Sequence, residues 1–337
     1  MGTRTKLVVV GNGMAGIRTV EELLKVAPDL YDITVFGAEP HPNYNRIMLS
    51  PVLAGEQTVD DIILNPLSWY AAHGITLHTG QQVVKLNRQR RCVVTADGAE
   101  APYDRLLLAT GSDPFILPIP GKDLDGVIGY RDISDTDYMI DTARTHSHAV
   151  VIGGGLLGLE AANGLLQRGM HVTVVHIGPW LLERQLDETA GRLLQQELEQ
   201  RGLHFRLGTQ TQELLGDASG RVSTVVFADG SRTPADLVVM AAGIRPRNAL
   251  AHQAGLHCDQ NGRGGITVSD TMQTVTDPRI YAVGECASHR GTAYGLVAPL
   301  YEQAKVVANH LAQIGIGRYQ GSRVSTKLKV TGIDLFS

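Results

Sequence analysis

The sequence is poor in the features that would commit a protein to several classes of function. Its three cysteines, Cys92, Cys258 and Cys286, are too far apart for a local disulfide framework, a CxxC pair or an iron–sulfur cluster. The formal net charge of -4 gives no basic excess that would indicate nucleic acid or an anionic membrane as a partner. We therefore expect small-molecule ligands, no nucleic acid and no metal site.

Long hydrophobic runs are missing as well. The first apolar stretch, residues 7–10, ends at a glycine and is too short for a secretory signal or for a membrane span of about 20 residues. We expect a cytoplasmic protein that does not cross a membrane. The hydrophobic content of 43% nevertheless suffices to bury a core in each of the roughly two domains that 337 residues suggest.

The most informative pattern present is a glycine loop that occurs twice, GNGMAG at 11–16 and GGGLLG at 153–158. Each copy follows a short apolar run typical of a buried parallel strand and precedes apolar residues at helical spacing. Such loops bind the pyrophosphate of a dinucleotide, because glycines allow close backbone approach and the helix N-terminus offers free N–H groups. We assign to nucleotide binding Gly11, Gly13, Met14, Ala15 and Gly16 in the first copy, and Gly153, Gly155, Leu156, Leu157 and Gly158 in the second.

A second repeat supports the first. Residues 93–111 match 225–243 at a constant offset of 132, through an Asp-Gly turn, a buried strand and a final glycine, Gly111 or Gly243. The alternation of strands and helices predicts an α/β fold with two Rossmann-like, three-layer ββα dinucleotide-binding domains. Prolines at 114, 118 and 120 indicate where the second domain is inserted in the first.

We therefore expect a discontinuous domain, 1–118 with 245–318, and an inserted domain, 119–244. The apolar runs predict strands at 33–36, 172–175 and 280–283 and helices over 17–25, 156–168 and 300–313. Residues 319–337 read as strand material that has no partner in the chain. We interpret them as the start of a truncated C-terminal domain, with an ordered tail as the alternative.

An acidic residue about 20 positions after such a loop accepts hydrogen bonds from ribose hydroxyls. Glu39 takes this place in the first copy, whereas the second copy has His176, followed by Glu183 and Arg184. An acid there would favour NAD and a cation would accommodate the 2′-phosphate of NADP, so the preference of the second copy stays open. Glu160, on the helix after the second loop, is our candidate for the charged neighbour of a nicotinamide and a flavin.

Four further segments carry a resemblance to a known family. They are YNRIMLSP at 44–51, LLGLEAAN at 156–163, STKLKVTG at 325–332 and the pair Gly284-Glu285. With the two loops, they resemble the pyridine nucleotide-disulfide oxidoreductase superfamily of flavoproteins. Within it they are similar to the N-terminal flavin region of assimilatory NAD(P)H nitrite reductase large subunits. Related ferredoxin and rubredoxin reductases have a lysine where this chain has Pro51.

The resemblance implies FAD in the discontinuous domain and NAD(P)H in the inserted one. It implies that FAD is contacted, beyond the loop and Glu39, by Arg46, Thr110, Gly111, Gly284 and Glu285. It implies that the segment from Gly243 and Ile244 to Pro246 borders the nicotinamide nucleotide, to which we also assign Glu160, His176 and Arg184. Such a protein is an enzyme, an FAD-dependent NAD(P)H oxidoreductase.

The resemblance further implies that electrons pass from FAD to iron–sulfur and sirohaem centres in C-terminal domains absent from these residues, for the reduction of nitrite to ammonia. One alternative is a stand-alone NAD(P)H:rubredoxin or ferredoxin reductase, or a nitrate reductase electron-transfer subunit, that serves a small electron-carrier protein. An alternative of another class is a flavin-binding redox sensor or scaffold. Assembly as a homodimer is left open.

Overall fold

The computed structural model describes residues 4–260 and 264–323 together with 327, 328, 330 and 333. The chain forms two compact units, here called unit 1 and unit 2. Unit 1 comprises 1–45, 63–113 and 245–324, and unit 2 comprises 46–62, 114–244 and 325–337. Of the predicted truncated C-terminal domain, residues 324–326, 329, 331, 332 and 334–337 lie outside the described residues.

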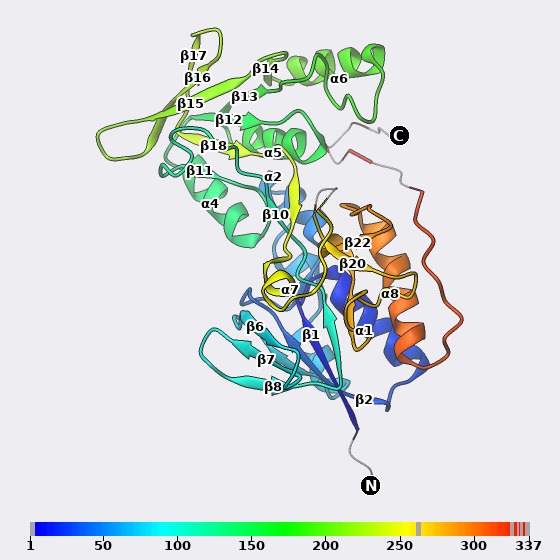
Figure 1. Cartoon of the computed structure of the whole chain (residues 1–337). Helices are drawn as coiled ribbons and strands as arrows, with labels where there is room; N and C mark the ends of the chain where they lie inside the picture. The colour runs from blue at the N-terminus through cyan, green and yellow to red at the C-terminus, as the bar shows by residue number, and fades with distance from the viewer. Residues whose placement is uncertain (1–3, 261–263, 324–326, 329, 331–332, 334–337) are drawn as a thin grey trace. The chain divides into compact units, whose positions relative to one another are not determined.

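Unit 1 is built around a parallel sheet. Its main elements are β1 (Thr5–Val10), α1 (Met14–Val26), β2 (Tyr31–Phe36), β5 (Thr76–His78), β6 (Val83–Asn87), β7 (Cys92–Thr95), β8 (Glu100–Pro102), β9 (Arg105–Leu108), β21 (Ile280–Ala282) and α8 (Val297–Leu311). The parallel strands run in the order β21-β9-β1-β2-β5. Helices α1 and α8 pack against each other, and the antiparallel sheet β6-β7-β8 forms a further layer (Figure 1).

Smaller elements complete unit 1. They are β3 (Asn43–Tyr44), β4 (Ile63–Asn65), α3 (Leu67–Ala72), α7 (Ala249–Gln253), β20 (Ile266–Val268), the 3₁₀ turn η3 (Gly284–Cys286) and β22 (Ala287–His289). Two short strands, β10 (Ser112–Pro114) and β19 (Ile244–Pro246), stand where the chain enters and leaves the inserted part of unit 2.

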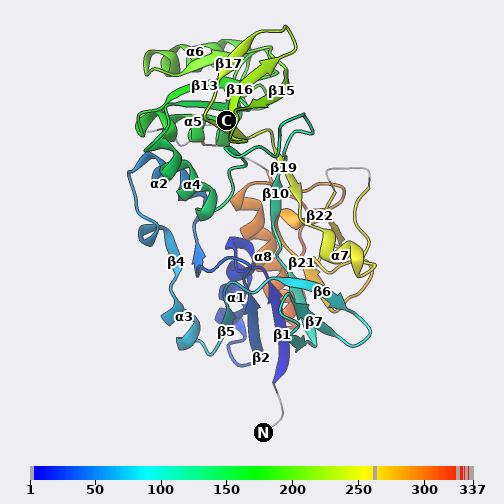
Figure 2. The ribbon, with the colours of Figure 1, turned by 90° about the vertical axis from the view of Figure 1, so that its left-hand side faces the viewer.

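Unit 2 is also built around a parallel sheet. Its main elements are α2 (Leu49–Ala54), β11 (Val127–Ile128), α4 (Ile133–Ala143), β12 (His148–Ile152), α5 (Leu156–Gln167), β13 (His171–Val175), α6 (Glu188–Gln200), β14 (His204–Arg206), β15 (Thr211–Gly216), β16 (Val222–Phe227), β17 (Arg232–Pro234) and β18 (Leu237–Met240). The parallel strands run in the order β11-β18-β12-β13-β14. Helix α5 packs on β12, β13 and β18, and the antiparallel strands β15, β16 and β17 form a separate layer (Figure 2).

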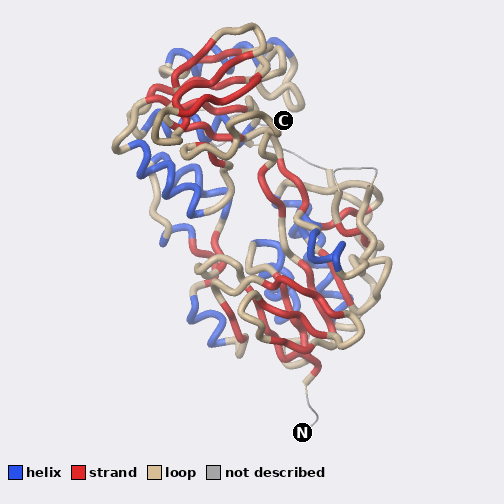
Figure 3. Tube along the Cα trace, turned by 60° about the vertical axis from the view of Figure 1, so that its left-hand side comes forward, coloured by secondary structure: helices blue, strands red, loops and turns tan. Residues whose placement is uncertain are grey.

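Four of the five strands in the two parallel sheets correspond, since β9-β1-β2-β5 and β18-β12-β13-β14 follow the same order. In each, the strand before the glycine loop (β1 or β12) lies between the strand after the next helix (β2 or β13) and the strand that closes the repeat (β9 or β18). Each unit therefore combines a group of strands with helices and a small antiparallel sheet (Figure 3). The fifth strand differs, because β21 comes late in unit 1 whereas β11 precedes the rest of the unit 2 sheet. The predicted fold class, with one Rossmann-like unit inserted in the other, is confirmed.

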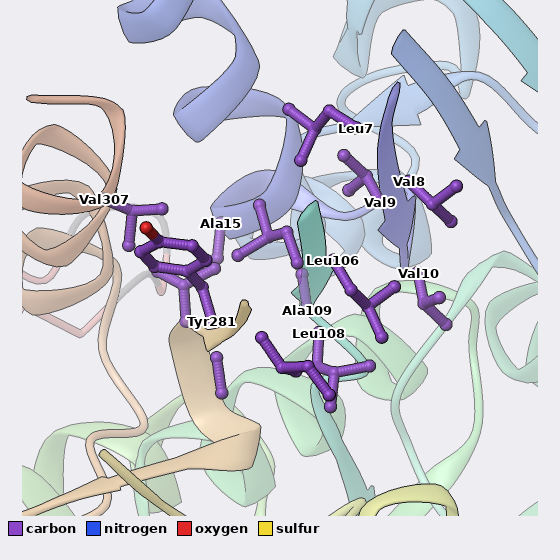
Figure 4. Packing of buried hydrophobic residues seen from close by; sticks show 14 of the residues in the cluster. Leu7, Val8, Val9, Val10, Ala15, Leu106, Leu108, Ala109, Tyr281 and Val307 are labelled. Carbon is purple, nitrogen blue, oxygen red and sulfur yellow. The ribbon is translucent and has the colours of Figure 1, made fainter. Parts of the chain in front are cut away.

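The apolar runs found in the sequence account for the core of unit 1. Residues 7–10 of β1 and 106–108 of β9 are almost completely buried, as parallel strands covered on both faces are. Ile17, Val20 and Leu23 occupy one face of α1 and belong to the same cluster. Figure 4 shows Leu7 to Val10 beside Leu106, Leu108 and Ala109. Among the described residues, no helix is both long and apolar enough to span a bilayer.

Residues 46–62 belong to unit 2 because α2 packs on α5. The guanidinium of Arg168, at the end of α5, donates to the carbonyls of Leu53 (2.6 Å) and Val52 (2.9 Å). Gly164 allows the close contact, since a Cβ there would lie 2.7 Å from Cγ of Leu53. Our expected domain boundaries place this segment in the discontinuous domain, and the assignment of domains to cofactors stays a prediction.

Tyr31 ties the start of β2 to the end of α8 and gives a test of unit 1. Its hydroxyl donates to the buried carbonyl of Leu311 at 2.9 Å. We expect Tyr31→Phe to lower the free energy of unfolding by about 1–2 kcal/mol, because the carbonyl loses its donor in a water-free place. Urea unfolding measures this. Tyr301→Phe, whose ring keeps the Arg18 guanidinium at 5.0 Å, should change stability by less than about 0.5 kcal/mol. Equal losses in the two variants would contradict the prediction.

Candidate dinucleotide-binding sites

The first glycine of each loop brings the loop against the strand that closes the repeat. Gly11 has a φ of +116° and Gly153 a φ of +134°, values that favour glycine. A Cβ on Gly11 would lie 2.1 Å from the carbonyl oxygen of Ala109, and one on Gly153 would lie 2.4 Å from that of Ala241. Both positions therefore require glycine for the fold itself.

The third glycine seats the helix on the loop. A Cβ on Gly16 would lie 2.5 Å from the carbonyl oxygen of Gly11, and one on Gly158 would lie 2.0 Å from that of Gly153. Such distances are impossible for a side chain, so the N-termini of α1 and α5 reach their positions only because these residues have none.

The middle glycine has no such structural reason. Gly13 and Gly155 are the N-cap residues of α1 and α5, with ordinary φ values of −87° and −85°. A Cβ on either would meet nothing within 4 Å. The free space adjoins the first N–H groups of a helix whose first turn carries no acidic residue. Both loops thus fit a pyrophosphate approaching the backbone, which is the ligand that accounts for a glycine here.

Asn12 ties the glycine loop of unit 1 to two other segments, and the sequence did not indicate either contact. The Asn12 amide donates to the carbonyl of His41 (3.2 Å) and accepts from the hydroxyl of Tyr70 (2.7 Å). Burial raises the pKa of Tyr70, so this hydroxyl stays a donor. Glu39, the predicted ribose ligand, accepts from the buried Tyr44 hydroxyl at 2.6 Å. The Tyr44 contact holds this carboxylate, which lies three residues after β2 ends.

A second group of predicted FAD residues lies together in unit 1. The hydroxyl of Ser112 donates to the Glu285 carboxylate at 2.9 Å. Gly284, with a φ of +85°, brings Glu285 to the start of α1, since a Cβ on it would lie 2.9 Å from the Cβ of Ala15. Thr110, the neighbour of Gly111, donates from its hydroxyl to the carbonyl of Arg247 at 2.6 Å. Ser112 is a polar residue of this group that sequence reasoning missed.

Cys286 follows Glu285 but is a packing residue. Its side chain is fully buried, and its thiol bonds to the carbonyls of Leu108 and Val283. Burial raises the pKa of the thiol, which disfavours a reactive thiolate. All three cysteines of the chain are free.

Two predicted residues belong to unit 2: Glu160 lies on α5, and Arg46 lies shortly before α2. The buried Glu160 accepts a hydrogen bond at 2.8 Å from the hydroxyl of Ser50, the residue that precedes Pro51. Arg46, predicted to approach the FAD phosphates, belongs to unit 2 and donates to the carbonyl of Arg131 at 3.0 Å. The functional roles of both residues stay predictions.

His176 is the first residue after β13 and is almost completely buried. Its Nδ1 accepts from the backbone N–H of Gly154 at 3.2 Å, and its Nε2 lies 2.8 Å from Oε2 of Glu183. Because the backbone N–H can only donate, the proton of the neutral ring is on Nε2 and is donated to Glu183. Arg184 is exposed, and Gly243 has a φ of +119° immediately before Ile244.

The fold and the paired loops define a protein that binds two dinucleotides. The sequence profile of the pyridine nucleotide-disulphide oxidoreductases matches residues 5–310, and the chain belongs to this family. FAD and NAD(P)H are the cofactors of the family, as expected from the sequence.

Two relatives and a solved structure show how far the likeness extends. The chain is 56% identical to a nitrite reductase [NAD(P)H] and 51% identical to an assimilatory nitrate reductase electron transfer subunit, both of Bacillus subtilis (strain 168). Each match covers 99% of this chain but 41% and 42% of the relatives, so the chain spans about two fifths of their length. A covalent putidaredoxin reductase–putidaredoxin complex includes a chain with a TM-score of 0.90 and 31% identity, matched over 99% of this chain and 81% of that one.

Gly155 and Gly158 lie in the same loop, but open space surrounds the first and backbone crowds the second, so that they can be tested as a pair. We expect Gly155→Ala to weaken NAD(P)H binding by about tenfold, because its methyl group occupies the space of the pyrophosphate, while stability falls by less than about 1 kcal/mol. Gly158→Ala should lower stability by about 3 kcal/mol, because its Cβ would collide with a backbone oxygen. Calorimetric titration and urea unfolding measure the two quantities. Unaltered binding by Gly155→Ala would contradict a pyrophosphate at this loop.

Proposed function

We propose that this chain is the flavin-reducing module of an NAD(P)H nitrite reductase. Unit 1 holds FAD, unit 2 holds NAD(P)H, and the electrons pass on to iron–sulfur and sirohaem centres of further domains that reduce nitrite to ammonia. The single observation that supports this most is the pair of open middle glycines, Gly13 and Gly155, each at a helix N-terminus with the same surroundings. The 56% identity to a nitrite reductase over 99% of the chain supports the choice of acceptor.

In this proposal the residues of unit 1 bind FAD and fix its position. The N–H groups of residues 14–16 bind the pyrophosphate, Glu39 accepts from the adenosine ribose, and Glu285 accepts from the hydroxyls of the ribityl chain. Ser112 holds the Glu285 carboxylate in place through its 2.9 Å hydrogen bond. When bound there, FAD would supply an acceptor for two electrons that can be released one at a time.

The residues of unit 2 bind and orient NAD(P)H. The N–H groups of residues 156–158 bind its pyrophosphate, and Gly243 and Ile244 border its nicotinamide half. Glu160 would face the nicotinamide, where its carboxylate would stabilise the positive charge of the oxidised ring. A cytoplasmic location belongs to the same proposal.

One alternative is that this chain belongs to a nitrate reductase electron transfer subunit. The 51% identity to a nitrate reductase electron transfer subunit nearly equals that to the nitrite reductase. If this chain is instead part of such an electron transfer subunit, the electrons pass to a separate protein. Transfer to a purified small iron–sulfur carrier at a rate matching flavin reduction would favour this alternative, whereas transfer only within a longer chain would favour the nitrite reductase.

Anaerobic mixing of the FAD-loaded protein with NADH or NADPH tests the common part of both functions. We expect at least one nucleotide to bleach the flavin absorbance within seconds, because hydride transfer needs only binding and orientation. The chain should also reduce ferricyanide but not nitrite, because its three cysteines are too far apart in the sequence to hold an iron–sulfur centre. Failure of both nucleotides would leave the flavin sensor or scaffold as the better interpretation.

Glu160→Gln tests the role given to the buried carboxylate. The amide can still bond to Ser50, so we expect unchanged flavin content and a flavin reduction rate lowered about tenfold, because the negative charge beside the nicotinamide is lost. Stopped-flow absorbance measures the rate. Glu197→Gln, at a surface pair with Arg201 on α6, is the control and should behave as the unaltered protein. A normal rate in Glu160→Gln would remove this residue from the site.

A further inference from the structure

Unit 2 has a glycine, Gly178, at the place that Glu39 occupies in unit 1. The carbonyl of Glu39 accepts from the N–H of Gly80, two residues after β5 ends. The carbonyl of Gly178 accepts the corresponding bond from Gly208, two residues after β14 ends. The position that would carry a ribose-binding carboxylate in unit 2 therefore has no side chain.

His176 corresponds in this register to Gly37. Unit 1 therefore has a side chain on the loop and a glycine after the strand, whereas unit 2 has a glycine on the loop and a side chain after the strand. In unit 1 the loop residue Asn12 fills the space beside Gly37, where a Cβ would lie 2.9 Å from the Cβ of Asn12. In unit 2 the loop residue is Gly154, and a Cβ on it would lie 2.7 Å from Cγ of His176. The glycine at 154 thus makes room for an imidazole that rises from the strand.

Glu183 brings a carboxylate into the space beside Gly178. A Cβ on Gly178 would lie 3.3 Å from Cδ of Glu183 and 2.5 Å from Nε2 of His176. The Nε2–H of His176 donates to Glu183 over 2.8 Å. The carboxylate missing from position 178 is supplied from five residues further on, and the imidazole orients it.

The backbone before Glu183 is held in a conformation that turns this side chain back to the loop. Leu182 has a φ of +54°, a left-handed conformation that costs a leucine about 1–2 kcal/mol. Its N–H donates to the carbonyl of Gly154 at 3.1 Å, and its side chain is buried. The segment is therefore tied to the glycine loop at the residue next to the carboxylate.

We propose that Glu183, oriented by His176, accepts hydrogen bonds from the adenosine ribose of the pyridine nucleotide and makes unit 2 select NADH over NADPH. This inference rests on the proposed function, since it concerns the same nucleotide. A carboxylate at this place bonds to a free 2′-hydroxyl, whereas the 2′-phosphate of NADPH would meet it with like charge. His176 acts as a positioning residue, because its bonded proton fixes the carboxylate.

Calorimetric titration of the FAD-loaded protein with NAD⁺ and NADP⁺ tests the inference without turnover. We expect tighter binding of NAD⁺, and Glu183→Gln should lower the NAD⁺-to-NADP⁺ affinity ratio about tenfold, the value of a hydrogen bond to a charged group. His176→Ala should lower the same ratio, which a merely structural role would leave unchanged because both affinities would fall together. Glu197→Gln is the matched control and should keep the ratio.

The outcomes separate the inference from the function on which it rests. Tighter binding of NADP⁺, or an unchanged ratio in Glu183→Gln, overturns the inference while the hydride-transfer function stands. A ratio that responds to Arg184→Gln but not to Glu183→Gln would assign the discrimination to the neighbouring cation and overturn it as well. Absence of binding by both nucleotides, with no bleaching of the flavin, overturns the proposed function too.

Discussion

The close backbone contact between each glycine loop and the strand that closes its repeat is the constraint on which the rest of the structure depends. At Gly11 and Gly153 there is no room for even a Cβ, and the third glycine of each loop lets the helix sit on the same backbone. The contact fixes the helix N-terminus at the carboxyl ends of the parallel strands, where ligands of open α/β sheets bind. The first N–H groups of α1 and α5 are thereby aimed at one place in each unit, and the strand-end residues are brought beside it.

The two copies of the repeat place their carboxylates differently. Unit 1 has its side chain on the loop, at Asn12, and its carboxylate at the end of the strand, at Glu39. Unit 2 has glycines at both corresponding positions, 154 and 178, and fills the space from His176 and Glu183. A shared backbone thus presents a carboxylate in both units, although the side chains come from different points of the chain. The absence of an acid at position 178 therefore does not mean that unit 2 has no carboxylate there.

Local pattern was enough to predict much of the fold. Glycine loops, apolar strand runs and helical spacing predicted the two Rossmann-like units and helices close to α1, α5 and α8, with α1 starting three residues earlier at its Gly13 cap. What sequence could not give were contacts between distant segments, such as Tyr70 with Asn12, Ser112 with Glu285, and Ser50 with Glu160. A side chain that takes over a role from a neighbouring loop, as we propose for Glu183, leaves no signal at the position where the motif expects it.

In our proposal each glycine loop serves two parts of its nucleotide, the pyrophosphate and the ribose. The helix end offers N–H groups and a positive dipole, and no acid lies in the first turn of α1 or α5 to compete with the pyrophosphate. The carboxylates of Glu39 and Glu183 follow β2 and β13 in the chain, and in our proposal they accept hydrogen bonds from ribose hydroxyls. In unit 2 both ring nitrogens of His176 form hydrogen bonds. One accepts from the N–H of Gly154, and the other donates to Glu183. His176 therefore links the loop backbone to the Glu183 carboxylate, and in our proposal one backbone turn serves both the pyrophosphate and the ribose.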